Sequence, residues 1–244
     1  MKEGVSRERI DHYLKFIEFT GRHPALSRAV LWLAYRIPPL KRALPVSMRI
    51  YMGGRILESY RVDKQKGEIS FGGVDRQIVG AEFPEVVFRN LAQLAGKEEA
   101  QRIMYDMHFR IMEEQLQKLD LEEIFPRFLA PLFRQPADAK RLESDPTLAR
   151  LYGEMERMLL RLLFSESGWG RPEFDSTPLP SKVTVHKSVE SVWMRPSAEP
   201  VCYAMAGSLA AFVSHIAGKR YAARETSCAA TGAPRCEFTL ESVE

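Results

Sequence analysis

The sequence predicts an α+β fold, in which an antiparallel sheet packs with several helices. Three observations point to it. Apolar residues recur at helical spacing over four segments between residues 83 and 218. Two short strand-like runs, KRYAARETS (219–227) and RCEFTL (235–240), then follow the last helix, with a Gly-Ala-Pro turn between them. A β–α–β–β order after several helices is typical of the α+β class.

The composition is that of a globular chain with a sizeable core. Of 244 residues, 45% are hydrophobic and 27% are charged. The longest apolar stretch, AVLWLAY, is far below the ~20 residues that span a bilayer. The start MKEGVSRERIDHY lacks the apolar run of a secretory signal. We therefore expect a soluble cytoplasmic protein.

Residues 1–65 are expected to form a helical extension that precedes a domain over residues 66–244. Helical spacing covers residues 6–21 and 23–37 and stops at Gly21 and at Pro38-Pro39. Residues 1–64 contain 13 Lys and Arg against 6 Asp and Glu, although the whole chain carries only +3. Such helices bind a protein partner or a membrane surface, or are simply solvated. We expect them to pack on the core or on a twin subunit, and we expect no nucleic-acid binding.

The helical part of the domain follows in order along the chain. Alternation in GEISFGGVDRQIVGAEF (67–83) predicts a strand or hairpin. Helices are then expected over 83–96, 97–119 and 146–164. The second helix is predicted to place one broad apolar face on the core, made of Ile103, Met104, Met107, Ile111, Met112, Leu116 and Leu119.

The C-terminal part begins after a predicted loop at 165–182, which is rich in Gly and Pro. KVTVHKSVESVWM (182–194) is expected to be one long strand or a hairpin arm. Residues 200–218 then form a small-residue helix that ends at Gly218, and the two strands named above complete the sheet.

All three cysteines of the chain lie in its last 43 residues. The hairpin would bring Cys228 and Cys236 together, with Glu225 three residues before the first. The helix after Cys202 is about 24 Å long and the returning strand about 33 Å, so Cys202 can meet the same point. Three thiolates and a carboxylate form a closed tetrahedral set that suits a structural Zn²⁺. The alternative is that small buried cysteines simply pack in the core.

The C-terminal segment resembles the 4-vinyl-reductase domain family. The resemblance rests on AMAGSLAAFVSHIAG, YAARETSC and GAPRCEF, within about residues 182–240. It implies a fold similar to a subunit family of the TRAPP Golgi-transport complex, and kinship with bacterial sensor domains for phenol- and toluene-like compounds. In aromatic-sensing members, zinc ligands lie beside the ligand pocket, and their pattern falls here on Cys202, Glu225, Cys228 and Cys236.

This resemblance predicts a binding, sensing or carrier domain for a small apolar molecule, aromatic or hydrocarbon-like, with Zn²⁺ as a structural cofactor. Methionine-rich helices suit varied apolar ligands. The candidate ligand contacts are Phe109, Met112, Trp169, Trp193, Tyr203 and Phe212, with His108 and His215 as partners for a ligand hydroxyl. Plain core packing accounts for the same residues without a ligand.

Two other functions stay open at this point. One is a dimeric scaffold or adaptor subunit that docks through the basic N-terminal helices, and we expect a homodimer. The other is an accessory protein or reductase of tetrapyrrole vinyl groups. The sequence contains no dinucleotide fingerprint, no flavin-like glycine motif and no Ser-His-acid set that we can place. We therefore expect a binding protein rather than an enzyme.

Overall fold

The structure is a computed structural model that describes residues 33, 36–40, 60–63, 68–71, 74–76, 80–121, 144–176 and 179–243. The chain divides into two compact units, which we describe separately. The first comprises Met1–Arg76 and Leu119–Glu154, and the second comprises Gln77–Lys118 and Met155–Glu244. The helices predicted over 6–21 and 23–37 lie outside the described residues, apart from residue 33 and residues 36–37.

The first unit contains a three-stranded antiparallel sheet. Its strands are β1 (Tyr60–Asp63), β2 (Glu68–Phe71) and β3 (Val74–Arg76), and they lie in that order. The hairpin predicted within 67–83 is confirmed, because β2 pairs with β3 on either side of Gly72-Gly73. Strand β1 was not predicted, since four residues are too few to show a clear alternation.

Helix α9 (Pro146–Leu160) begins at a side-chain cap. The Asp145 carboxylate accepts the backbone N–H groups of Thr147 and Leu148, at 3.0 and 3.2 Å. The helix continues as a π-helical turn, Arg161–Ser165. Its predicted apolar residues are all buried: Leu148, Leu151, Met155, Met158, Leu159 and Leu162.

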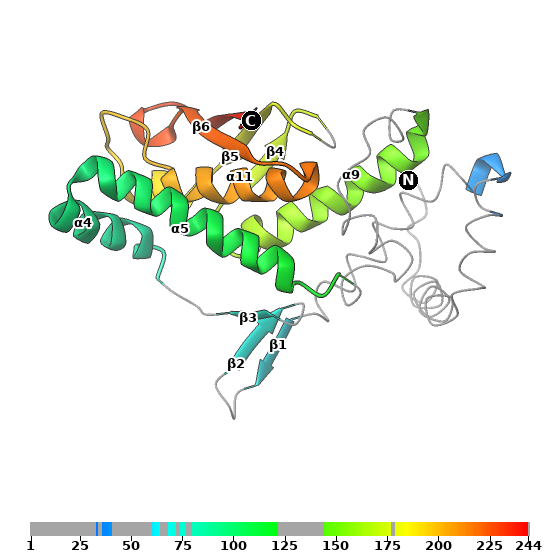
Figure 1. The fold of residues 1–244 in the computed structure, drawn as a ribbon, viewed down its shortest axis with the longest axis horizontal. Helices are drawn as coiled ribbons and strands as arrows, with labels where there is room; N and C mark the ends of the chain where they lie inside the picture. The colour runs from blue at the N-terminus through cyan, green and yellow to red at the C-terminus, as the bar shows by residue number, and fades with distance from the viewer. Residues whose placement is uncertain are drawn as a thin grey trace, which may run out of the picture. The chain divides into compact units, whose positions relative to one another are not determined.

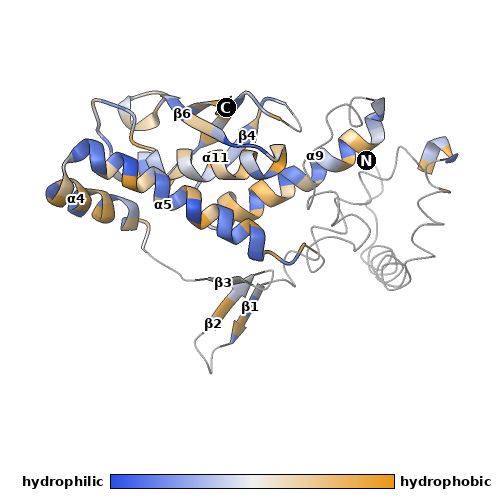
Figure 2. Cartoon of the chain, viewed as in Figure 1, coloured by the Kyte–Doolittle hydropathy of each residue, from blue (hydrophilic) through white to orange (hydrophobic). Residues whose placement is uncertain are grey.

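Three helices of the second unit match the predicted segments. Helix α11 (Tyr203–Ala217) lies between α5 (Lys97–Lys118) and a four-stranded sheet (Figure 1), and α4 (Phe83–Ala95) packs beside α5. Eleven of the fifteen residues of α11 are buried. Figure 2 shows mainly hydrophilic residues on the visible face of α5, as expected for an outer helix. Among the described residues, no helix combines the length and hydropathy needed to cross a bilayer.

Helices α5 and α11 approach each other most closely at Gly207. A methyl group built on Gly207 would lie 2.2 Å from the backbone oxygen of Tyr105 and 3.1 Å from the backbone nitrogen of Phe109. Only a residue without a side chain fits there, so the main chains of the two helices are in direct contact. This packing holds the apolar face of α5 on the core.

The sheet of the second unit is antiparallel throughout, which confirms the predicted α+β class. Its strands are β4 (Arg171–Phe174), β5 (Lys182–His186), β7 (Cys236–Ser242) and β6 (Tyr221–Ser227), in that spatial order. Strand β7 is central, and its first residue lies opposite Val185 of β5. The predicted β6–β7 hairpin is therefore confirmed.

Two segments of the second unit differ from the prediction. Residues 171–174, inside the predicted loop at 165–182, form β4. Pro172 suggested a loop, but proline is tolerated here because β4 is an edge strand. The strand predicted over 182–194 ends at His186. Lys187 has φ +54° and turns the chain into helix α10 (Val189–Trp193).

The predicted buried face of α5 is correct only in part. Met104, Met112, Leu116 and Leu119 are buried, but Ile111 is 42% exposed. His108 and Phe109 are buried instead, so the core-facing stripe passes through them. The sequence pattern favoured every apolar residue, whereas the stripe follows the line of contact with α11.

Candidate metal centre and apolar site

The three cysteines and Glu225 converge at one end of the sheet, as the sequence predicts. Cys202 is the N-cap residue of α11, Glu225 lies on β6, Cys228 follows β6, and Cys236 begins β7. One ligand atom from each of these residues lies within 4.8 Å of the others. Four segments of the chain therefore meet at this cluster, which we call the cysteine cluster.

The distances within the cysteine cluster fit a tetrahedral ion. The Sγ atom of Cys202 lies 3.9 Å from that of Cys228 and 3.6 Å from that of Cys236. Zinc–sulfur bonds of about 2.3 Å in tetrahedral geometry place sulfur atoms about 3.8 Å apart. The sulfur atoms are also too far apart for disulfides, and all three cysteines are free and buried.

Glu225 presents one free oxygen to the cysteine cluster. Its Oε2 accepts the backbone N–H of Cys202 at 2.8 Å. Its Oε1 is buried and has no hydrogen-bond partner among the residues that the structure describes. Burial raises the pKa of Glu225 to about 7, against the opposing effect of the Cys202 N–H. A buried oxygen without a partner is costly, and a metal ion would remove that cost.

The thiols are arranged to carry negative charge. Hydrogen bonds from the thiols of Cys202 and Cys236 lower the pKa of Cys228, and the contact with Cys228 raises the pKa of Cys202. The Sγ of Cys236 accepts the backbone N–H of Ala229 at 3.4 Å. Only one thiolate is favoured without a counter-ion, whereas a divalent cation would favour all three.

The turn between β6 and β7 is fixed by its own hydrogen bonds. After Cys228 the chain forms a 3₁₀ turn (Ala229–Thr231) and passes through Gly232, which has φ +98°. The Thr231 hydroxyl donates to the Cys228 carbonyl at 2.8 Å, as does the Ala233 N–H at 3.3 Å. The positive φ favours glycine, and it directs the chain back toward Cys236.

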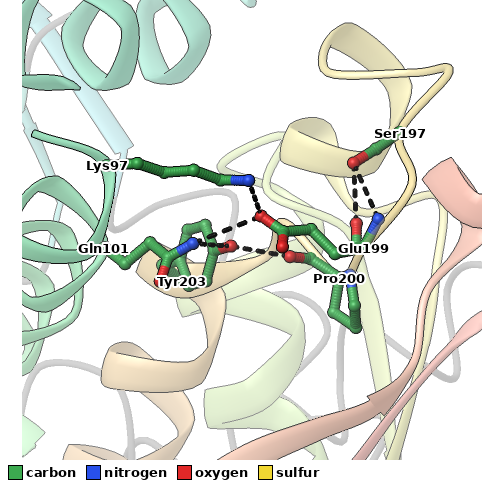
Figure 3. A network of polar contacts seen from close by, with 6 residues as sticks. All are labelled: Lys97, Gln101, Ser197, Glu199, Pro200 and Tyr203. Atoms are coloured by element: carbon green, nitrogen blue, oxygen red, sulfur yellow. Dashed lines mark hydrogen bonds and ion pairs between the residues drawn. The ribbon is translucent and has the colours of Figure 1, made fainter. Parts of the chain in front are cut away.

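A second network of polar contacts holds the loop that leads into Cys202 (Figure 3). Glu199 forms an ion pair with Lys97 and accepts a hydrogen bond from Gln101 at 3.4 Å. Gln101 also donates to the Tyr203 hydroxyl at 2.7 Å, and that hydroxyl donates to the Pro200 carbonyl at 2.7 Å. The start of α5 is thereby joined to the start of α11.

Helix α5 also contacts the other arm of the cysteine cluster. One turn after Gln101, the hydroxyl of Tyr105 accepts the backbone N–H of Ala223 at 3.2 Å. Ala223 lies on β6, two residues before Glu225. A single face of α5 thus contacts both the segment that carries Cys202 and the strand that carries Glu225.

His108 continues the same face of α5 and lies in an apolar environment. Its ring packs edge-on against Trp169, with 4.9 Å between the ring centroids. Only 6% of His108 is exposed, and burial lowers its pKa to about 4, so the imidazole is neutral at pH 7. No hydrogen bond joins its ring to another residue in the described part of the chain, which leaves its donor and acceptor available. Trp169 is held by main-chain hydrogen bonds to Phe164 and Val189.

The other predicted ligand contacts occupy different surroundings. Phe109, Met112 and Phe212 are buried, and Phe212 packs edge-on against Phe164 and Phe174. Tyr203 stacks on Phe88, and His215 is partly exposed near the end of α11.

Trp193 is 46% exposed and lies in an open groove of about 530 Å³. The groove is lined by Glu85, Phe88, Arg89, Ala92, Gln93, Trp193, Met194 and Arg195. None of the other seven predicted contacts lines this groove. Only His108 and Trp169 combine a polar group with an aromatic ring in direct contact.

Sequence reasoning missed Glu190, which lies on α10 and is 1% exposed. Its carboxylate accepts hydrogen bonds from the backbone N–H groups of Ala204 and Met205. Burial raises its pKa to about 8, against the opposing effect of those two hydrogen bonds. The signal was present in the sequence, since Glu190 is the one acid within the segment VESVW.

Comparisons with known proteins agree with this geometry. Residues 182–242 match the model of the vinyl-4-reductase domain family, which confirms the resemblance found in the C-terminal segment. The chain is similar to the phenol-responsive sensory domain of the transcription activator PoxR, solved with phenol. The identity is 16% and the TM-score 0.60, over 80% of this chain and 90% of that one.

The chain is also similar to a vinyl-4-reductase family protein from Methanocaldococcus jannaschii. The identity is 14% and the TM-score 0.38, over 69% of this chain and 85% of that one. A search of curated protein sequences gave no significant match. The similarity to the PoxR domain shows the fold.

Proposed function

We propose, starting from the vinyl-4-reductase domain match over residues 182–242 and the fold shared with the PoxR sensory domain, that this chain binds a small aromatic molecule that carries a hydroxyl group. The observation that carries the proposal is the neutral, buried His108 against Trp169. A buried imidazole without a hydrogen-bond partner is unfavourable, and a ligand hydroxyl would satisfy it. The name of the PoxR domain, which responds to phenol, supports this ligand class.

We also propose that the cysteine cluster binds Zn²⁺ through Cys202, Glu225, Cys228 and Cys236. The sulfur spacing and the unpartnered Glu225 oxygen support this assignment. With four protein ligands no coordination position is left for a substrate, so the ion would join α11 to the hairpin rather than take part in a reaction. The homodimer and the cytoplasmic location stay predictions, of which light scattering tests the first.

Phenol is expected to stabilise the protein against thermal unfolding. A ligand at about 100 times its Kd adds about 2.7 kcal/mol. For a chain of this size that corresponds to a rise in Tm of roughly 5–10 °C. The measurement is a thermal-shift screen with phenols, alkylbenzenes, fatty acids and porphyrins.

His108→Phe is the matched control, because it keeps a ring against Trp169 but removes the polar group. The variant is expected to bind phenol about tenfold more weakly, as for the loss of one hydrogen bond, and to bind toluene as before. If no apolar class shifts the Tm of the natural protein, the binding function is wrong. If phenol binding survives the substitution, His108 is not the hydroxyl partner.

Acid is expected to destabilise the natural protein more than the His108→Phe variant. The folded state lowers the pKa of His108 to about 4, below its ordinary value of 6.5. The unfolded chain therefore binds a proton that the folded chain does not, and stability is lost as the pH falls from 6.5 toward 4. Between pH 7 and pH 5 the difference should reach about 2 kcal/mol.

Urea unfolding of both proteins at pH 7 and pH 5 measures this difference. Acid also acts on the cysteine cluster, but that effect is common to both proteins and cancels in the comparison. Equal losses of stability in the two proteins would show that His108 titrates as it does in water.

A further inference from the structure

Glu190 places a buried carboxylate at the start of α11, next to a member of the cysteine cluster. Its Oε1 accepts the backbone N–H of Ala204 at 3.0 Å, and its Oε2 accepts that of Met205 at 2.8 Å. Both oxygens are used, and Glu190 is 1% exposed. The cap therefore comes from another helix, 14 and 15 residues earlier in the chain.

The cap completes the hydrogen bonding of the first turn of α11. The N–H of Tyr203 donates to the Val201 carbonyl at 3.0 Å, and the N–H of Cys202 donates to Glu225. Together with the two hydrogen bonds to Glu190, these contacts satisfy the amides that a helix N-terminus leaves without intrahelical partners. Two carboxylates thus fix the backbone on both sides of the Cys202 carbonyl.

Helix α10 also reaches the side chain of Cys202. Ser188, the N-cap residue of α10, is fully buried, and its Oγ lies 3.2 Å from the Sγ of Cys202. The hydroxyl of Ser191 donates to the Ser188 carbonyl at 2.8 Å and closes the turn. The segment that carries Glu190 therefore contacts Cys202 through its sulfur as well as through the following backbone.

We propose that Glu190 is a positioning residue for the metal centre: by holding the Ala204 and Met205 amides it fixes the start of α11, and with it the direction of the Cys202 sulfur. This inference rests on the proposed metal site. Residues that orient metal ligands without binding the ion typically change metal affinity 10- to 100-fold when they are replaced.

Asp145 provides a matched control for a simple helix cap. Its carboxylate accepts the amides two and three residues further on, at 3.0 and 3.2 Å, at the start of α9. Glu190 makes the same contacts with the N2 and N3 amides of α11. Helix α9 carries no residue of the cysteine cluster, so Asp145→Ala reports the loss of a carboxylate cap alone.

The experiment uses the full chain and two measurements. Zinc affinity is measured by competition with a chromophoric chelator, and the absorption spectrum of the Co²⁺-loaded protein reports the geometry of the sulfur ligands. Glu190→Ala is expected to weaken Zn²⁺ binding about 10- to 100-fold and to change the Co²⁺ bands. Glu190→Gln, with one acceptor oxygen in place of two, is expected to weaken it about tenfold. Asp145→Ala should lower the Tm by about 2–4 °C and leave zinc affinity within about twofold.

Three results would overturn the proposal. If Glu190→Ala and Glu190→Gln keep the natural zinc affinity and Co²⁺ spectrum, and only their Tm falls, Glu190 is an ordinary cap. If Glu190→Ala does not fold, Glu190→Gln decides between the same two outcomes. If the natural protein itself binds neither Zn²⁺ nor Co²⁺, the metal site fails, and the role of Glu190 fails with it.

Discussion

Replacing Cys236 with serine is expected to abolish metal binding and to lower the Tm by about 10 °C. Cys236 is fully buried at the start of the central strand β7, and its sulfur lies 3.6 Å from that of Cys202. An ion present at about 1,000 times its Kd contributes about 4 kcal/mol to the stability of the folded state. At roughly 2–4 °C per kcal/mol, its loss gives the expected shift.

Elemental mass spectrometry and thermal unfolding, on tag-free protein, measure the two effects. We expect about one zinc per chain in the natural protein and a small fraction of that in the variant. A strong chelator should lower the Tm of the natural protein to that of the variant, and it should leave the variant unchanged. A natural protein without metal, whose Tm ignores the chelator, would leave the cysteines as packing residues.

Gly207→Ala is expected to destabilise the protein by about 3 kcal/mol or more, for a steric reason. The added methyl group would lie 2.2 Å from the Tyr105 carbonyl oxygen, and a main-chain atom cannot rotate away as a side chain can. Helices α5 and α11 would have to separate, which would disturb the core on both sides. Urea unfolding of the variant measures the loss.

Gly168→Ala is the control for this substitution. A methyl group at Gly168 meets nothing within 4 Å, but the residue has φ +78°. Its cost is therefore that of a left-handed conformation alone, about 1–2 kcal/mol. If Gly207→Ala costs no more than Gly168→Ala, the main chains of α5 and α11 are less tightly packed than described.

The cysteine cluster could be predicted from the sequence because it depends on local geometry. The length of α11 and the β6–β7 turn determine where Cys202, Cys228 and Cys236 meet, and periodicity shows both elements. Glu190 could not be found in this way. Its partners lie on α11, and its position requires the turn at Lys187 that ends β5.

The ligand contacts were harder to predict for a related reason. An aromatic residue can pack in the core, face a groove or contact a ligand, and the three outcomes share one sequence pattern. Trp193 faces a groove, Phe212 packs between Phe164 and Phe174, and only Trp169 contacts a buried imidazole. Such differences depend on contacts between elements that are distant in sequence.

The face of α5 that contacts both arms of the cysteine cluster has a consequence for energetics. Gln101 and Tyr105 join this helix to the segments that carry Cys202 and Glu225, and His108 follows on the same face. A molecule that changes the position of α5 must therefore change the affinity of the cluster for its ion. Thermodynamic reciprocity then requires the ion to change the affinity for that molecule by the same factor. Titration calorimetry of one in the presence and absence of the other measures that factor directly.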